Sequence, residues 1–185
     1  MAYFGLSNPW IAKLDVDKKT YSDGFKNGTA VGTDVTPQYN EANLYGDNIL
    51  QESTKEFKYA DVTLNTTHMP IEAADVMFGH TVDTETKEIK YNASDTANYV
   101  GYGFYASEKI AGKTTYIAAI LPKVIFAEAA ENYTTKGDSL EFKTPSVAGK
   151  AMPLDNGEWK VKRTFDTEAE AVAFIKEYLN ITEEA

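Results

Sequence analysis

Alternation of apolar and polar side chains at every second position runs through the first two thirds of the chain. Trp10, Ala12, Leu14 and Val16 occupy alternate positions of one segment, and the pattern returns in residues 57–67. Successive side chains of a β-strand point to opposite faces, so this period predicts strands that each bury one face in a core. Such alternation is typical of antiparallel sheets and restricts the chain to a mainly antiparallel β fold.

Further strands are predicted where β-branched and aromatic residues cluster between turn signals. They comprise a segment from Tyr21, a hairpin over residues 81–91, and strands over residues 98–107, 114–127, 140–144 and 159–165. Pro122 interrupts one of these strands and predicts an edge position or a bulge, because proline donates no ladder hydrogen bond. Asn27 and Gly28 predict a hairpin turn, since both residue types tolerate positive φ.

Two helices are expected. Residues 70–79 carry a proline in the first turn and a glycine at the C-terminal cap, and predict a short helix. Residues 167–180 begin with a capping box of Thr167 and Glu170. This second helix must lie on a sheet, because a helix of this length is marginal by itself. Its apolar stripe is formed by Val172, Ile175 and Leu179.

Residues 33–55 are polar and predict a long assembly loop. At about 20 residues it exceeds the usual connection between elements, so it is either functional or disordered. Several of its side chains are of the kind that proteins bury, which indicates a loop that packs onto something. These side chains are Tyr39, Leu44, Tyr45, Ile49 and Leu50.

A length of 185 residues allows one domain with a substantial core. The chain shows no internal repeat and no low-complexity linker. We therefore expect a single α+β domain over residues 1–185, mainly antiparallel β, built as a sandwich or barrel with one or two helices packed on it.

Composition excludes several classes of function. The chain has no cysteine, which excludes disulfides, thiolate metal sites and cysteine nucleophiles. Its net charge of −10 argues against a protein that holds DNA through phosphate contacts, although DNA could still travel past it. No apolar run approaches the roughly 20 residues of a membrane span, and the N-terminus lacks a secretory pattern. We expect a soluble protein made in the cytoplasm.

Residues with catalytic or ligand-binding chemistry are sparse. A zinc site at His68 and His80 would need further ligands without any cysteine, so an exposed imidazole or a helix-end residue is favoured. The stretch from Asp15 begins like a calcium loop but has threonine where that loop needs glycine. Gly101 and Gly103 lie within a strand pattern and predict a bulge or a close backbone approach, not a dinucleotide site.

Acidic residues offer one further catalytic possibility. Glu128, Glu131 and Asp138 would have to pair in a cleft to act as a glycosidase, but among 28 acidic residues some will lie close together by chance. No phosphate-binding loop and no Gly-x-Ser-x-Gly elbow is present. We expect no enzyme activity, no cofactor and no metal.

The chain as a whole resembles the major tail protein family of phages with long, non-contractile tails that infect Gram-positive bacteria. The resemblance is carried by short motifs spread over nearly the full length. They are residues 5–13 (GLSNPWIAK), 21–24 (YSDG), 28–32 (GTAVG), 42–48 (ANLYGDN), 52–53 (ES), 156–160 (NGEWK) and 165–171 (FDTEAEA).

The resemblance implies a tail-tube fold whose copies close into hexameric rings that stack into a hollow tube. DNA would pass through the bore during ejection without specific binding. It also implies a place in the virion tail, with the host cytoplasm before assembly. The expected partners are further copies of the chain and the tape measure, tail terminator and distal tail proteins, with no membrane and no catalytic residues. The residues expected at contacts between subunits are Tyr39, Leu44, Tyr45, Asp47, Ile49 and Leu50.

Other interpretations stay open. A carbohydrate-binding β-sandwich would expose a row of aromatic residues, but Trp10 and Trp159 lie in alternating strands that favour core packing. A tube subunit of a contractile tail or a secretion apparatus would share the fold, and a retaining hydrolase is more distant. The acidity would either let DNA slide along the bore or keep the free subunit soluble.

Overall fold

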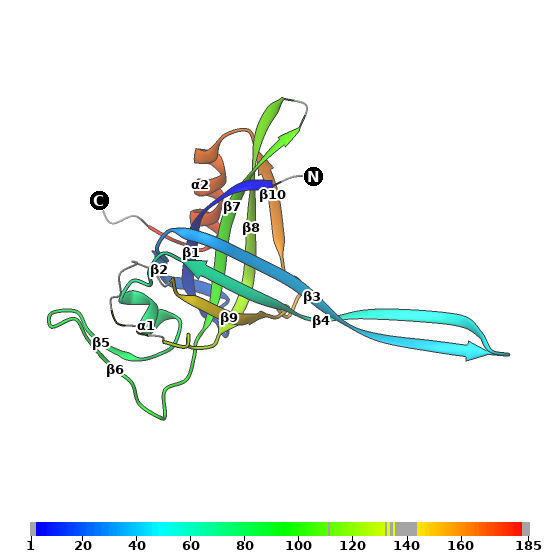
Figure 1. The fold of residues 1–185 in the computed structure, drawn as a ribbon, viewed down its shortest axis with the longest axis horizontal. Helices are drawn as coiled ribbons and strands as arrows, with labels where there is room; N and C mark the ends of the chain where they lie inside the picture. Colours follow the sequence, from blue (N-terminus) through cyan, green and yellow to red (C-terminus); the bar gives the residue numbers. More distant parts are fainter. Residues whose placement is uncertain (1–2, 111, 132, 134, 136–143, 183–185) are drawn as a thin grey trace.

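The computed structural model describes residues 3–110, 112–131, 133, 135 and 144–182 (Figure 1). The element order is β1 (Tyr3–Asp15), β2 (Thr20–Lys26), β3 (Ala30–Gly46), β4 (Ile49–Thr66), α1 (Glu72–Val76), β5 (Thr81–Asp83), β6 (Glu88–Lys90), β7 (Tyr99–Ile110), β8 (Lys113–Phe126), β9 (Ser146–Ala151), β10 (Val161–Phe165) and α2 (Glu168–Tyr178). The predicted hairpin over residues 81–91 and both predicted helices are confirmed. The strand predicted over residues 140–144 falls almost wholly outside the described residues.

The main sheet runs in the order β2-β1-β7-β8-β9-β4-β3, with β10 beside β8. All pairings among the described strands are antiparallel. The predicted class, α+β and mainly antiparallel β, is therefore confirmed. Strand order follows chain order only in part, because β1 pairs with β7 across a long stretch of sequence.

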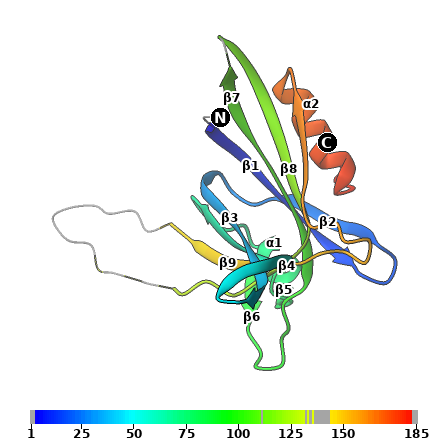
Figure 2. The same ribbon diagram turned by 90° about the vertical axis from the view of Figure 1, so that its right-hand side faces the viewer.

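Two hydrophobic cores lie on opposite sides of the layer formed by β1, β7 and β8. The first core joins this layer to β4, β9 and α1, and the second joins it to α2. Figure 2 shows α2 on one side of the layer and β3, β4 and β9 on the other. Ile11 and Ala12 are both fully buried, each in a different core. The prediction that this strand buries only one face is therefore wrong, because a second layer covers the other face.

Glycines in β7 let α2 pack directly on the sheet. A Cβ at Gly103 would lie 2.5 Å from Cγ2 of Ile175, and one at Gly101 would lie 2.5 Å from Cδ2 of Leu179. The register between β7 and β8 also shifts between Val100 and Tyr102. Both predicted roles of these glycines, a bulge and a close approach, are confirmed.

Pro122 sits where β8 changes partners. On one side of it, β8 pairs with β10 as far as Ile120, and on the other it pairs with β9 from Val124. The missing N–H of the proline therefore breaks no pairing on this edge, and the register shift of β7 lies opposite. The predicted bulge is confirmed.

The hairpin turn predicted at Asn27 and Gly28 is wrong. β2 pairs with β1, and β3 pairs with β4, so the segment links two parts of the sheet instead of closing a hairpin. Gly28 does have a positive φ of 62°, and a Cβ there would lie 2.3 Å from the carbonyl oxygen of His68. A glycine is therefore needed where the link between β2 and β3 passes close to the backbone of His68.

The C-terminal helix begins as predicted. The Thr167 hydroxyl accepts a hydrogen bond from the Glu170 N–H, and the Glu170 carboxylate accepts one from the Thr167 N–H. Ala171, Ile175 and Leu179 are fully buried against the sheet. Tertiary packing thus completes a helix that would be marginal alone.

Candidate functional site

The segment over residues 33–55, predicted as a loop, is a continuous part of a long β-hairpin. β3 and β4 pair from Ala30 and Thr66 to Gly46 and Ile49. The turn consists of Asp47 and Asn48, whose φ angles are 49° and 61°, as a two-residue hairpin turn with both central residues at positive φ requires. The loop prediction failed because both faces of residues 40–56 meet solvent, so this part of the two strands shows no alternation.

Beyond the pair Tyr39 and Phe57 the hairpin leaves the body of the protein, and we call residues 40–56 the arm. Every arm residue is exposed except Gly46, which is half-buried. β9 pairs with β4 only as far as Ala60, so within the described chain the arm has no third strand. Figure 1 shows the arm reaching far to one side of the body.

Aromatic packing fixes the base of the arm. The register shifts between Gln38 and Tyr39 and leaves Lys58 without an opposite residue. This bulge turns Phe57 toward the core side of the sheet, where its ring stacks on Trp159 at 4.5 Å between centroids. The Tyr39 ring meets Phe57 edge-on. The direction of the arm is therefore set by contacts with the body.

The tip of the arm is apolar on both faces. Tyr45 lies opposite Leu50, and Ile49 lies opposite Gly46 on the face that also carries Leu44. Leu44, Tyr45, Ile49 and Leu50 are 60%, 65%, 64% and 50% exposed. These four residues account for a large share of the exposed large apolar side chains among the described residues.

Charges divide the arm into a polar middle and an acidic tip. Lys55 Nζ lies 3.1 Å from Glu41 Oε2, and the hydrogen bonds from Lys55 and Asn43 lower the pKa of the Glu41 carboxyl. The tip carries Asp47 in the turn and Glu52 opposite Leu44. An apolar tip that carries two carboxylates is suited to contact with the surface of another protein molecule.

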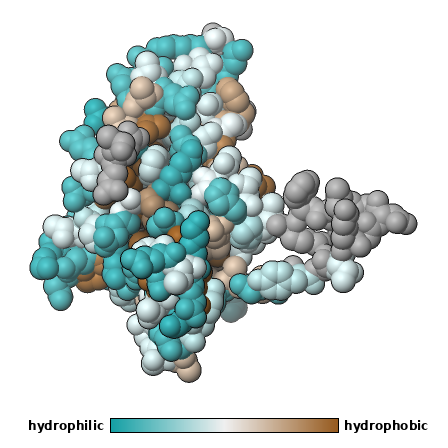
Figure 3. Space-filling model, turned by 90° about the vertical axis from the view of Figure 1, so that its left-hand side faces the viewer, coloured by the Kyte–Doolittle hydropathy of each residue, from teal (hydrophilic) through white to brown (hydrophobic). Residues whose placement is uncertain are grey.

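Five of the six residues predicted at subunit contacts gather at this tip: Leu44, Tyr45, Asp47, Ile49 and Leu50. Tyr39, the sixth, lies at the base of the arm and packs on Phe57. The predicted core packing of Trp10 and Trp159 is confirmed, since each is half-buried against one of the two cores. Figure 3 shows another face of the molecule as mostly hydrophilic, with small, separate hydrophobic spots.

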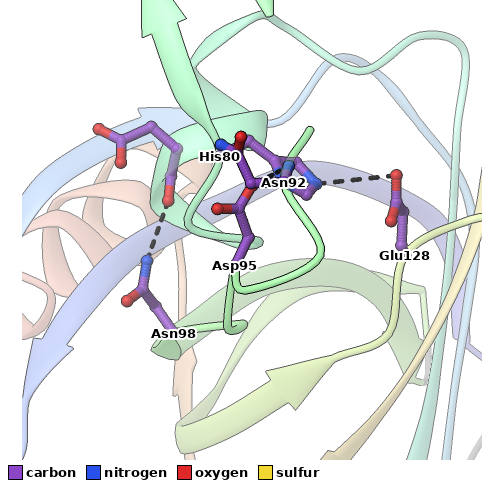
Figure 4. Close-up of polar contacts among 6 residues, drawn as sticks. His80, Asn92, Asp95, Asn98 and Glu128 are labelled. Carbon is purple, nitrogen blue, oxygen red and sulfur yellow. Dashed lines mark hydrogen bonds and ion pairs between the residues drawn. The ribbon is translucent and has the colours of Figure 1, made fainter. Parts of the chain in front are cut away.

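A second candidate site surrounds His80 (Figure 4). His68 is exposed, whereas His80 follows the end of α1 and is only 7% exposed. His80 Nδ1 lies 2.8 Å from Asp95 Oδ2, and its Nε2 lies 3.7 Å from Glu128 Oε1. Nε2 is buried and has no hydrogen-bond partner in the described part of the chain. Sequence reasoning missed this burial because the residues that cover His80 come from distant segments.

The His80 site is tied to α1 by a set of hydrogen bonds. The hydrogen bond with His80, together with one that the Asn92 N–H donates to Asp95 Oδ2, holds the pKa of the Asp95 carboxyl below its ordinary value. Asn98 Nδ2 donates to the carbonyl oxygen of Asp75 near the C-terminal end of α1. A cavity of about 870 Å³ adjoins His80 and is bordered by Glu128 and Glu131.

The chemistry available at this second site is limited to one oriented imidazole. Among residues 3–110, 112–131 and 144–182, no group of three or more His, Asp or Glu side chains is arranged to hold a metal ion. The His80–Asp95 pair instead fastens residues 92–98 to the end of α1. Its clearest role is structural.

No protein-family model matches the chain, and no curated protein sequence matches it. None of the helices in the described residues is long and apolar enough to cross a membrane.

Proposed function

We propose that this chain is the structural subunit of a phage tail tube, which assembles through its arm into stacked rings around a DNA conduit. The proposal joins the resemblance to major tail proteins with one structural observation, the uncovered arm with an apolar tip. Under this proposal the protein is not an enzyme, it resides in the virion tail, and its partners are its own copies and the other tail proteins named above.

An arm of this form is poorly suited to a protein that works alone. A single two-stranded hairpin is at best marginally stable in water, and both faces of this one are exposed. Long edges also invite pairing with other chains unless something covers them. Covering the arm with a neighbouring subunit would satisfy both its backbone edges and its apolar tip.

The arm can join copies head to tail, as a ring or a stack requires. It projects from one side of the body, so the surface that receives it belongs to a different part of the next copy. Contacts of this heterologous kind close into rings or continue into filaments. Tubes made of stacked rings use both outcomes.

Negative-stain microscopy of the concentrated protein tests the proposal. We expect rings or tubes roughly 80–100 Å wide, the width of six such domains around a hole. The matched variant replaces residues 40–56 with Asn-Gly, which joins Tyr39 to Phe57 by a two-residue turn and removes both paired legs together. We expect this variant to fold and to remain monomeric.

Two outcomes would contradict the proposal. Tubes formed by the armless variant would show that the arm is not the assembly element. A parent protein that stays monomeric at high concentration and binds glycans would favour the carbohydrate-binding alternative.

A further inference from the structure

A second opening lies between the two layers of the sheet, on the body of the protein. This groove has a volume of about 500 Å³. Its walls come from the first residues of β1, from β3 near the base of the arm, and from β7, β8 and β10. Its apolar lining includes Phe4, Leu6, Val35, Phe104, Ile117 and Ala119.

Within the described residues, two strand edges without a hydrogen-bonded partner strand border the groove. β2 pairs with β1 only from Trp10 to Asp15, so the earlier part of β1 pairs with β7 alone. Within the described residues β3 pairs only with β4. Open edges of this kind can hydrogen-bond to an added extended segment, which is how many sheets bind a partner.

The charge of the groove favours binding of a segment that carries carboxylates. Lys160 and Lys162 of the β10 segment both line it, with Asp34 as the only carboxylate in the described lining. Burial, with a smaller effect from Lys162, lowers the pKa of the Lys160 ammonium. No carboxylate of the described residues lies within ion-pair distance of Lys160. A carboxylate placed here would offset both the burial of the Lys160 ammonium and its repulsion from Lys162.

We infer that this groove receives the arm tip of a second copy of the chain. Leu44, Tyr45, Ile49 and Leu50 would contact the apolar lining, and Asp47 and Glu52 would approach Lys160 and Lys162. The arm of the same copy points away from the body (Figure 1), and the stacking of Phe57 on Trp159 holds its base in that direction. The inference rests on the proposed assembly role and names its receptor surface.

The cavity beside His80 is the alternative receptor, but it is bordered by carboxylates and so would repel the acidic arm tip. Glu128 and Glu131 border that cavity, together with the exposed Tyr133. Placing Asp47 and Glu52 there would bring carboxylates together, and like charges across an interface oppose binding. This cavity therefore supplies the matched control.

Charge reversal tests the pairing in solution. We expect the Lys160→Glu/Lys162→Glu variant and the Asp47→Lys/Glu52→Lys variant each to need about a hundredfold more protein to assemble, because attraction becomes repulsion. The four substitutions combined in one chain should restore assembly, as should an equal mixture of the two double variants. Wild-type assembly by both double variants would overturn the inference and leave the tube proposal standing.

Cysteine cross-linking detects contact between the arm tip and the groove even when no tubes form. The native chain has no cysteine, so Ile49→Cys in one copy and Phe4→Cys in another introduce the only thiols. We expect a disulfide-linked heterodimer from this mixture, and at least about tenfold less from Ile49→Cys mixed with Glu131→Cys at the control cavity.

Each cross-linking result either supports or overturns the proposed contact between the arm tip and the groove. Equal yields, or a preference for the control cavity, would overturn the inference. Tubes without the arm–groove cross-link would reject the groove and keep the tube, and absence of both would reject both. A groove that instead holds a small amphipathic acid would also give no cross-link to the arm.

Discussion

Removing the apolar character of the arm tip should abolish assembly and leave the fold intact. The change replaces Leu44, Tyr45, Ile49 and Leu50 with serine. These side chains are 50–65% exposed in the free subunit, so assembly can bury at most that part of each. Full burial of a large apolar side chain contributes about 1.5–3 kcal/mol, which gives roughly 1 kcal/mol or more for each residue here.

The four residues together should contribute about 5 kcal/mol per arm. Since about 1.4 kcal/mol corresponds to a factor of ten, the protein concentration required for assembly should rise by roughly a few thousandfold. Exposed positions usually change stability by less than about 0.5 kcal/mol each, so the melting temperature should move by only a few degrees. Sedimentation velocity and negative-stain microscopy over a concentration series measure the first quantity, and thermal unfolding by circular dichroism measures the second.

A control variant carries serine at Val16 and Tyr133, which are exposed but lie outside both the arm and the groove. It should assemble at the parent concentration. The reasoning is refuted if the arm variant assembles like the parent, or if it loses assembly only because it unfolds.

The remaining predictions concern the fold that positions the arm. Gly103→Ala should destabilise the protein by about 1–3 kcal/mol in chemical denaturation, because its Cβ would meet Ile175, whereas Gly32→Ala, whose Cβ would lie 3.5 Å from Asn65 Nδ2, should be tolerated. Thr167→Ala should cost about 1 kcal/mol through loss of the helix cap, with assembly by sedimentation unchanged; an equal stability would contradict the capping role. The pKa of Asp95 is lowered from 3.8 in the native state, so its contribution to stability is present above that pH and is lost as the pH falls. Asp95→Asn should therefore be less stable than the parent at neutral pH, and urea titrations should show the difference narrowing below about pH 4; a constant difference would contradict it.

Local patterns in the sequence were sufficient to predict features that depend on one residue type and its neighbours along the chain. The capping box at Thr167 and Glu170 satisfies the first N–H groups of a helix from within the same turn, and it formed as predicted. Pro122 predicted an interruption of pairing, and the strand changes partners there. Such features depend on neighbours in sequence and need no knowledge of the fold.

The sequence singled out the residues of the candidate site, but it predicted a loop where the structure has two paired strands. The apolar residues of segment 33–55 marked it as a contact surface, but their irregular spacing hid two paired strands. An alternating pattern appears only where one face is buried, and the free subunit buries neither face of the arm. A signal was nevertheless present in the residues Gly46, Asp47 and Asn48, which suit a tight turn with positive φ.

The sequence by itself determined the class of the fold and the caps and interruptions of its elements. The tertiary structure alone decided that residues 33–55 lie in two paired strands that end in the arm, because strand pairing joins Ala30 to Thr66 and so aligns everything between them. It also decided that β1 has two buried faces and that a basic groove lies beside open strand edges. These properties arise when segments far apart in the chain meet in space, and no local pattern records which segments will meet.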